Sequence, residues 1–408
     1  METASIDSTR DKPVHQAART DIVESARRLG PALRERSAEG ARLRRLPDAT
    51  ISDLIETGIL RMMQPARWGG REDSFDTFVT VVSEIARAEG STGWVLGILG
   101  IHPWQTALYP RETQEEVWGA DPTAFNSSSY APTGKAERVS DGYCVSGRWS
   151  FSTGCDHCQW VNLGAFAEMV KVEGHEVPDF RSFLIPRKDY RIDDNWHVAG
   201  MSGTGSKDIV VDNAFVPDHR SQSHWDYMVG APLPGWEVNP GPLYRLPWAV
   251  VFNYAIAAAI MGASRGFLDL WLGISRTRKG GLSGGEIKDD PFAQKLTAES
   301  IYAIDGGIAR LRADAAAMMA AAEKGGPLDR KWRAQLRYNA NRSAQLAVQA
   351  VDRMYEASSG RIIFNDHPLQ RTYQDIKAML SHAYLNVDIP ARIFGAMELG
   401  VPTLECLL

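Results

Sequence analysis

The chain is poor in cysteine, and it has neither a long apolar run nor a long basic run. It has 408 residues, of which 4 are cysteines, and its formal net charge is −5. So few cysteines exclude a disulfide framework, and the longest apolar run, Ala255–Ala263, is too short to span a bilayer. The first twelve residues lack the apolar region of a secretory signal. We therefore expect a cytoplasmic protein that binds neither a membrane nor nucleic acid.

Two of the cysteines nevertheless stand at the spacing of a metal or redox motif, Cys155-Asp-His-Cys158. A structural zinc site needs about four ligands, and the sequence has no second pair of cysteines or histidines at ligand spacing. A thioredoxin-type motif would begin a helix after a strand, whereas this one follows a glycine in a strand-rich region. We expect small residues that pack near a turn, and no metal.

The secondary-structure pattern changes twice along the chain, near residues 121 and 226. Before the first change, segments such as Phe75–Ala88 carry apolar residues at the spacing of an amphipathic helix. Between the changes, short β-branched and aromatic segments are bounded by Gly, Pro, Asp and Asn, which is typical of an antiparallel sheet. We predict an α+β protein with an N-terminal helical domain over residues 1–120, a central antiparallel β-domain over 121–225 and a C-terminal helical domain over 226–408.

The C-terminal domain is predicted to form a four-helix bundle. It contains four long periodic stretches, two of whose connections are rich in glycine. Pro390 lies in the last stretch and predicts a kink or a break there. The stretches are Val250–Arg276, Pro291–Lys324, Leu328–Ser358 and Leu369–Leu399.

Two strings in the β-region indicate a bound flavin. Gly147–His157 reads GRWSFSTGCDH, and Gly200–Asp208 reads GMSGTGSKD. Both place hydroxyl side chains and bare glycine backbone beside an aromatic or apolar neighbour, which suits a flat ring with a polar edge such as isoalloxazine. The second string is not a dinucleotide motif, because it lacks the third glycine and precedes a strand rather than a helix. A flavin protein without a nicotinamide site must receive its electrons from elsewhere.

The order of helices, strands and helices, together with several short strings, resembles the acyl-CoA dehydrogenase fold. More narrowly, the chain resembles the oxygenase components of two-component flavin-dependent aromatic hydroxylases, a group that includes hydroxylases of secosteroid phenols and of 4-hydroxyphenylacetate. The resemblance runs from about Arg44 to Pro402 and has no counterpart in Ser221–Tyr244. The strings that carry it include Gly90–Trp94, Gln114–Gly119, Ser127–Pro132, Ser152–His157 and Lys288–Ala293.

This resemblance implies a homotetrameric flavoenzyme that hydroxylates a small aromatic, phenolic substrate. Reduced flavin, as FADH2 or FMNH2, would come from a separate NAD(P)H:flavin reductase, and O2 would add to it as a C4a-hydroperoxyflavin. Oxygenation at N or S also occurs in the wider family. Neither the substrate nor the choice between FAD and FMN follows from the sequence.

A true acyl-CoA dehydrogenase is the main alternative, and it needs a carboxylate base for the α-proton. In the commonest branch of that family a Tyr-Glu pair supplies the base, shortly after a string that corresponds here to Gln374–Lys377. The matching positions are His382 and Ala383, and alanine cannot accept a proton. Other dehydrogenases carry the Glu on an earlier helix, but Val250–Leu272 contains no Glu. A non-catalytic flavin-binding relative is the third alternative.

Three residues are candidates for catalysis: His382, His102 and Ser152. Histidine suits proton transfer near neutral pH, and the resemblance places His382 in the active site and His102 near the phenol oxygen of the substrate. Ser152 matches a hydroxyl that reaches the flavin N5 region. The structural alternatives are two packing histidines and a serine that caps the turn before Gly154.

Seven residues are candidates for flavin binding. The tryptophan among them either packs on the isoalloxazine or fills the sheet interface. The two arginines either bind the flavin phosphate, often that of a neighbouring subunit, or are solvated charges favoured by the helix dipole. One serine of residues 127–129 is expected to line the ring, and a glycine after the third bundle helix allows close backbone approach. The set is Trp149, Ser152, Ser128, Ser206, Arg276, Arg278 and Gly360.

Overall fold

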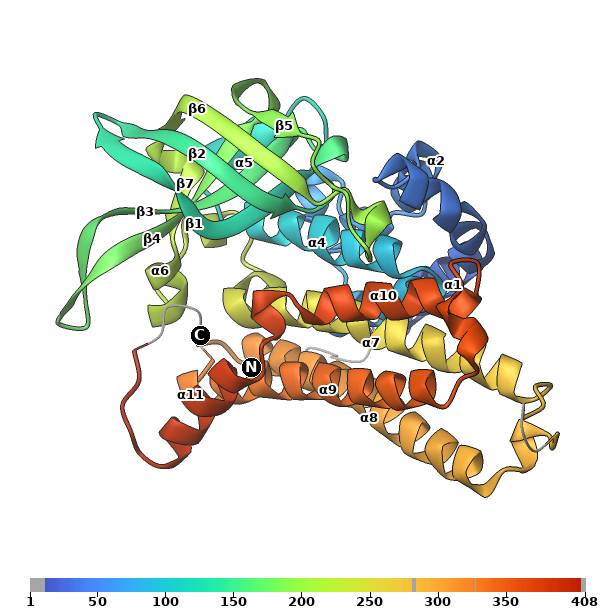
Figure 1. Cartoon of the computed structure of the whole chain (residues 1–408). Helices are drawn as coiled ribbons and strands as arrows, with labels where there is room; N and C mark the ends of the chain where they lie inside the picture. Colours follow the sequence, from blue (N-terminus) through green and yellow to red (C-terminus); the bar gives the residue numbers. More distant parts are fainter. Residues whose placement is uncertain (1–11, 281–283, 327, 405–408) are drawn as a thin grey trace, which may run out of the picture.

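The computed structural model describes residues 12–280, 284–326 and 328–404. A seven-stranded sheet packs on one side of a set of helices, and helix α4 (Gly90–Thr106) lies between the sheet and the long helices of the C-terminal half (Figure 1). Every residue of α4 is buried. Residues at its two ends line the candidate site.

Five helices precede the sheet. The amphipathic segment Phe75–Ala88 forms helix α3, as predicted, with its apolar face buried. Glu89 follows α3 and caps α4, because its carboxylate accepts hydrogen bonds from the backbone N–H and the hydroxyl of Thr92. The helices are α1 Lys12–Leu43, α2 Asp48–Glu56, α3 Phe75–Ala88, α4 Gly90–Thr106 and α5 Arg111–Trp118.

The central region forms one sheet in the order β5-β6-β2-β1-β3-β4-β7. The prediction of a purely antiparallel sheet was wrong in one respect. Strands β1 and β3 run parallel, with Asn126 opposite Trp160. Strand β2 folds back along one edge of β1, and the chain then returns through a short helical turn, Cys155–His157, so that β3 begins beside the start of β1. The strands are β1 Asn126–Val139, β2 Gly142–Ser152, β3 Trp160–Val172, β4 His175–Pro186, β5 Arg191–Asp193, β6 Lys207–Pro217 and β7 Ser221–Ser223.

The C-terminal region contains the predicted long helices, but the last stretch is two helices rather than one. The break lies between Leu380 and Asp388 and contains His382. The predicted break at Pro390 was therefore misplaced. Pro390 lies in the first turn of α11, where its missing N–H removes no helical hydrogen bond. The helices are α6 His224–Val229, α7 Trp248–Ser275, α8 Pro291–Glu323, α9 Arg330–Glu356, α10 Pro368–Leu380 and α11 Asp388–Glu398.

One hydrophobic core runs through both helical regions, from Ile22 in α1 to Leu385 after α10. Helix α7 packs against α3, α4, α8 and α9 within it. By length and composition α7 could cross a membrane, but 78% of its most apolar window is buried inside the protein. The division into domains at residues 120 and 225 stays a prediction.

Candidate flavin and substrate site

His102 lies near the C-terminal end of α4 and is fully buried. Its Nδ1 is 2.5 Å from the carbonyl oxygen of Ile98, one turn earlier in the helix, and therefore donates to it. Burial lowers the pKa of His102 to about 3, so the ring is neutral at pH 7. A neutral ring that donates through Nδ1 has a free lone pair on Nε2, so Nε2 is a hydrogen-bond acceptor with a fixed direction.

Tyr130 of β1 faces this acceptor. Its hydroxyl donates to Oε1 of Gln105 and lies 3.4 Å from Nε2 of His102. Burial raises the pKa of Tyr130, and the hydroxyl of Ser128 also bonds to it. Ser128 and Tyr130 share a face of β1 because they are two residues apart, so Ser128 is the serine of residues 127–129 that faces α4.

Four rings surround the point where Tyr130 meets α4, and we call them the aromatic box: Tyr130, His224, Trp248 and Phe252. The Tyr130 ring meets those of Trp248 and Phe252 edge-on, at 5.0 and 5.6 Å between centroids. Trp248 stacks on Phe252 at 4.3 Å, and His102 meets the edge of Phe252 at 5.5 Å. A planar aromatic ligand is well matched by such a lining.

Ser152 lies one strand away from the box, at the end of β2. It is buried, and its hydroxyl donates to Oγ of Ser127 at 2.9 Å. Next to it, Ser206 lies 2.8 Å from the hydroxyls of both Thr153 and Thr204. Ser206 therefore joins the two glycine-rich strings through Thr153, whereas Ser152 bonds to Ser127 of β1. The hydroxyl oxygens of both groups can accept further hydrogen bonds.

Trp149 occupies the sheet interface. It is fully buried in the core of the sheet, and its indole N–H donates to the carbonyl oxygen of Gly164 at 2.7 Å. A Cβ added at Gly134 would lie 1.8 Å from the indole, so that residue must be glycine for the ring to fit. These contacts favour the packing alternative over a stacking role.

Phe151 lies between Trp149 and Ser152 in the sequence of β2 and was not predicted as a site residue. It points outward with 69% of its surface exposed, and its backbone φ of 68° is in the left-handed region. That conformation is rare for a bulky residue, and such strain concentrates at functional sites. Its ring meets the edge of Trp196 at 6.1 Å. The exposed ring next to Ser152 is a better stacking surface than Trp149.

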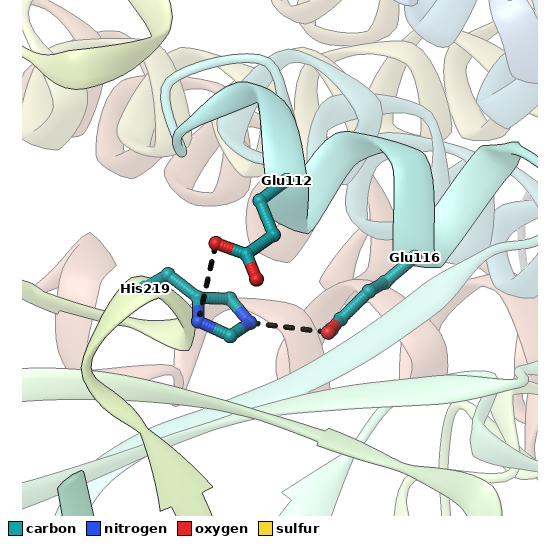
Figure 2. Close-up of side chains that lie close together, drawn as sticks. All are labelled: Glu112, Glu116 and His219. Carbon is teal, nitrogen blue, oxygen red and sulfur yellow. Dashed lines mark hydrogen bonds and ion pairs between the residues drawn. The ribbon is translucent and has the colours of Figure 1, made fainter. Parts of the chain in front are cut away.

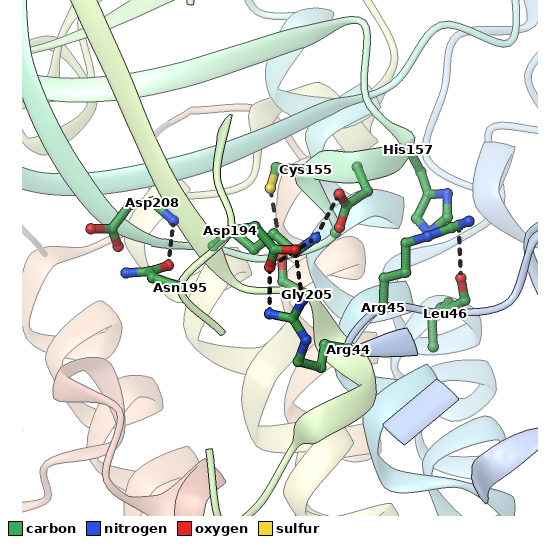
Figure 3. Close-up of polar contacts among 12 residues, drawn as sticks. Arg44, Arg45, Leu46, Cys155, His157, Asp194, Asn195, Gly205 and Asp208 are labelled. Atoms are coloured by element: carbon green, nitrogen blue, oxygen red, sulfur yellow. Dashed lines mark hydrogen bonds and ion pairs between the residues drawn. The ribbon is translucent and has the colours of Figure 1, made fainter. Parts of the chain in front are cut away.

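Ion pairs hold the second glycine-rich string in place (Figure 3). Lys207 is buried, and its Nζ lies 2.9 Å from Asp156 and 3.4 Å from Asp194. Asp194 also pairs with Arg44 at the end of α1. Lys207 is thus paired with two carboxylates and stabilises the loop. In the same loop, the carbonyl oxygen of Gly205 accepts a hydrogen bond from the thiol of Cys155.

His382 lies at the other end of α4. Its side chain is exposed to solvent, and the protein around the ring lowers its pKa to about 4. The ring meets the edge of Trp94 in α4 at 5.5 Å, and its Nδ1 accepts from the backbone N–H of Tyr384 at 3.2 Å. The neutral ring must therefore carry its proton on Nε2, which is a donor.

The three remaining candidates lie at the far end of α7. Arg276 is exposed, and Arg278 donates to the carbonyl oxygen of Ala357 at 2.8 Å, beside the segment that contains Gly360. A Cβ at Gly360 would meet no atom of this chain within 4 Å, so nothing in the described residues approaches it closely. From Ala255, which packs on α4 at Gly97, to Arg276 is about 30 Å along α7. The structure therefore brings Arg278 and Gly360 together but not near Ser152.

A cluster with metal-ligating groups lies elsewhere, on the surface (Figure 2). His219 points Nε2 at Glu116, 3.1 Å away, and Nδ1 at Glu112, 3.7 Å away. A single ion can take only one nitrogen of a ring, and here the two nitrogens face different carboxylates, which describes a surface ion pair. The thiols of Cys155 and Cys158 are each directed at a backbone carbonyl oxygen.

Several residues of this site were missed by sequence reasoning. Tyr130 could have been found, because it lies two positions after Ser128 in the same strand. His224 lies within the loop-rich stretch 217–247, which has no periodicity, and Trp248 directly follows it. The exposure of Phe151 depends on a backbone angle. No sequence pattern announces these three.

The residues present fit a flavin. The exposed ring of Phe151, the hydroxyls of Ser152 and Ser127, and Nε2 of His382 offer a stacking surface, acceptors and a donor. Within the described chain, the buried side-chain amide of Asn126 also has no acceptor for its N–H groups. Such a set of groups suits a flat ring with a polar edge.

Comparisons with known proteins agree with this reading. Residues 254–387 match the family described as acyl-CoA dehydrogenase, C-terminal domain. The chain is 39% identical over 381 residues to the flavin-dependent monooxygenase, oxygenase subunit HsaA, of Rhodococcus jostii (strain RHA1), with 93% of this chain and 98% of that protein covered.

Solved structures of similar proteins cover nearly the whole chain. The 3-HSA hydroxylase from Rhodococcus sp. RHA1 matches with a TM-score of 0.88 and 38% identity over 95% of this chain and 99% of that one. XiaF from Streptomyces sp., in complex with FADH2 and glycerol, matches with a TM-score of 0.86 and 27% identity over 97% and 100%.

Proposed function

The chain belongs to the oxygenase subunits of flavin-dependent monooxygenases, and we propose that it uses reduced flavin and O2 to hydroxylate the ring of a small phenol. One observation carries the choice of a phenol. The hydroxyl of Tyr130, itself a phenol, lies 3.4 Å from the acceptor nitrogen of His102, in a lining of aromatic rings. A substrate phenol bound beside Tyr130 would meet the same acceptor.

His102 orients the substrate in this proposal. Its Nδ1–H is held by Ile98, so Nε2 can only accept, and it fixes the direction of the phenolic O–H. Accepting that hydrogen bond moves electron density from the O–H bond into the ring, which makes the ring carbon a better nucleophile. Because burial keeps His102 neutral, this acceptor is available throughout the physiological pH range.

The flavin would lie between the end of β2 and the segment that carries His382. Phe151 would stack on the ring, Ser152 would bond to its polar edge, and Nε2 of His382 would donate to the reacting oxygen. When bound, reduced flavin supplies the two electrons and, with O2, the oxygen atom for the hydroxylation. The buried position of α4 behind the site keeps water away from it.

Arg276 and Arg278 would serve the flavin of another subunit. They lie about 30 Å along α7 from the part that packs on α4, which is out of reach of a flavin whose ring lies at Ser152. Large aromatic residues are also exposed on α8 and between α9 and α10, with Phe292 at 80%, Tyr302 at 84% and Phe364 at 58%. These features support a homotetramer in which bundle faces pair. The reductase would be a separate protein, as the name oxygenase subunit implies for the relatives, and both proteins would be cytoplasmic.

A turnover experiment tests the function. The protein is mixed with an NAD(P)H:flavin reductase, NADH, FAD or FMN, a phenol and isotopically labelled O2, and the product is analysed by mass spectrometry. One labelled oxygen atom per product molecule is expected. Absence of product, together with bleaching of bound FAD by an acyl-CoA thioester, would instead indicate a dehydrogenase. Absence of both would indicate a non-catalytic relative.

A further inference from the structure

Two buried asparagines contact the segment that contains His382. Asn253 lies in α7 and Asn341 in α9, and both are 0% exposed. The break between α10 and α11 packs against these two helices (Figure 1). An amide side chain in a hydrophobic core needs hydrogen-bond partners, because burying it without them is unfavourable. The partners of the two amides therefore show which part of the fold they stabilise.

Those partners are backbone carbonyl groups of the break. Nδ2 of Asn341 donates to the carbonyl oxygens of Tyr384, at 2.9 Å, and of Asn386, at 2.7 Å. Nδ2 of Asn253 donates to the same oxygen of Tyr384, at 3.0 Å, and to Oδ1 of Asn341, at 2.7 Å. Each amide thus uses both of its N–H groups, and the oxygen of Tyr384 receives two donors, one for each lone pair.

The same partners fix the orientation of both amides. A backbone carbonyl oxygen can only accept, so the amide atom that faces it must be the nitrogen. Turning either amide over would set its oxygen against the carbonyl oxygen of Tyr384. Asparagine is the shortest side chain with two N–H donors and an acceptor, and at position 341 all three are used.

The carbonyl groups that are held lie two and four residues after His382, and local hydrogen bonds connect them to it. The backbone N–H of Tyr384 donates to Nδ1 of His382 at 3.2 Å, and that of Leu385 donates to the carbonyl oxygen of His382 at 2.8 Å. Leu385 is 2% exposed and belongs to the core. The hold of α7 and α9 on Tyr384 therefore extends to the ring of His382.

The ring of His382 depends on this backbone for its direction. It is exposed, and it meets α4 at the edge of Trp94, with 5.5 Å between the centroids. An exposed ring is not enclosed by packing, so the segment that carries it decides where Nε2 points. A shift of about 1 Å in a reacting group can cost a factor of about 100 in rate. A donor at this position therefore needs a rigid support.

We propose that Asn341 and Asn253 are positioning residues for His382, because they hold the backbone that directs its Nε2. This inference rests on the proposed function, in which that donor meets the reacting oxygen at the flavin. The two asparagines act only through His382 and contact neither substrate nor flavin. Asn253 directly follows Phe252 of the aromatic box, so helix α7 supports both the substrate lining and the donor segment.

Chemical modification of His382 tests this hold without flavin or turnover. Diethyl pyrocarbonate reacts with the neutral imidazole, and mass spectrometry of the peptide that contains His382 gives the rate. The protein around the ring lowers its pKa to about 4, so the wild-type rate should be nearly equal at pH 5.5 and pH 7.5. In Asn341→Ala the released ring should return towards the ordinary pKa of about 6.5, and the rate should be about tenfold lower at pH 5.5 than at pH 7.5. Equal rates at both pH values in the variant would overturn the proposal.

Turnover with the reductase measures the consequence for the reaction. Asn341→Ala should lower the product formed per NADH consumed by about fivefold, less than removal of the His382 ring, and should leave the affinity for reduced flavin unchanged. In a His382→Ala background the same change should have no further effect on this ratio, because the group that Asn341 positions is absent. Losses that multiply in the double variant would show that Asn341 does not act through His382.

Two other changes in α9 are matched controls. Asn339→Ala removes an amide whose Nδ2 donates to Asp314 at 2.9 Å, and not to the break. Val348→Ala opens a cavity in the core about 10 Å along the helix from Asn341 and destabilises the fold there. Both variants should keep the wild-type ratio of product to NADH and equal modification rates at the two pH values. A loss in Val348→Ala as large as that in Asn341→Ala would assign the effect to stability and contradict the proposal.

If Asn341→Ala does not fold, Asn253→Ala takes its place. Asn341 then keeps both of its bonds to the backbone, so the expected loss of product per NADH is smaller, about twofold. The outcomes separate this proposal from the proposed function. Absence of product from the wild-type protein would remove the function, whereas a wild type that forms product and an Asn341→Ala variant that forms as much per NADH would remove only the positioning role.

Discussion

The two ends of helix α4 each place a histidine at the candidate site, and they do so in different ways. At the C-terminal end, His102 is fully buried and its Nδ1 is bonded to its own helix. At the N-terminal end, His382 comes from the break between α10 and α11, is exposed, and meets the edge of Trp94 in α4. Trp94 and His102 are eight residues apart, or about 12 Å along the axis.

This difference separates two kinds of proton chemistry. Both histidines are neutral at pH 7, since burial lowers the pKa of His102 to about 3 and the protein around the exposed His382 lowers the pKa of that ring to about 4. The neighbours of each ring fix opposite tautomers, so that His102 offers an acceptor and His382 a donor. The buried end is suited to holding a substrate hydroxyl, and the accessible end to meeting a group that arrives from solvent.

The largest expected effect lies at the buried end. We expect His102→Asn to lower kcat/KM for phenol hydroxylation by about 100-fold or more, in the range for loss of a positioned acid–base group. Unchanged activity would show that His102 is a packing residue and would contradict its role as the acceptor for the substrate hydroxyl. Steady-state product analysis measures the effect, with His175→Asn, an exposed histidine of β4, as the control.

Two buried carboxyl groups, Asp375 and Glu89, lie near the N-terminal end of α4. Burial lowers the pKa of a histidine but raises the pKa of a carboxyl group, so this pair tests the effect of burial in the opposite direction. Asp375 accepts from the backbone N–H of Met201 at 2.5 Å, and burial, with Glu89 nearby, raises its pKa to about 7. A folded pKa above the unfolded one means that the folded state binds the proton more tightly. The stabilisation is complete at low pH and is lost as pH rises from about 4 through 7.

Asp375→Asn should therefore stabilise the protein at pH 8.5 by about 4 kcal/mol, given about 1.4 kcal/mol for each pKa unit between 3.8 and about 7, and should have little effect below about pH 4. Asparagine keeps the oxygen that accepts from Met201. Urea denaturation at the two pH values measures the difference. An equal change at both pH values would show that Asp375 is not protonated in the fold.

His382→Ala should reduce the product formed per reduced flavin consumed by about tenfold and leave the affinity for reduced flavin unchanged. The reason is that Nε2 of His382 is the donor at the accessible end, and its loss affects the reaction rather than the binding surface. Product and NADH consumption are measured together. Ser381→Ala, at the neighbouring exposed position, is the control, and equal coupling in both variants would make His382 structural.

The parts of the molecule that follow from periodicity were predictable, and the parts that depend on chain reversal were not. The amphipathic pattern of Phe75–Ala88 defines α3, and alternation in β1 already places Ser128 and Tyr130 on one face. The parallel pairing of β1 and β3 depends on where the chain returns after β2, which no local pattern encodes. The break that exposes His382 precedes Pro390, because the proline favours the start of a helix as much as the end of one.

In the site, too, some features were predictable from the sequence and others depend on how the chain folds back. Family strings singled out His102, His382 and Ser152 as candidates, because their positions in the sequence are fixed. They could not show that Trp149 is enclosed by the sheet, which results from glycine at position 134 in a neighbouring strand. Nor could they show that Phe151 carries the exposed ring.

Phe151 provides the smallest and sharpest test of the accessible end, because its two roles predict changes of opposite sign. Its φ of 68° is strained for phenylalanine and relaxed for glycine, so Phe151→Gly should stabilise the fold by about 1 kcal/mol. The same change removes the stacking ring and should weaken binding of reduced flavin about fivefold, as the loss of one aromatic contact allows. Phe151→Leu keeps the strain and should weaken binding without stabilising the fold.

Urea denaturation and anaerobic flavin titration measure the two quantities on the same samples. Phe166→Leu, at a residue of β3 that is also exposed, at 49%, is the control and should change neither. If Phe151→Gly raised stability without weakening flavin binding, the strain would serve only the turn that leads to Ser152. A variant that is more stable and binds flavin less tightly would show that the accessible end of α4 holds a strained ring in place for its cofactor.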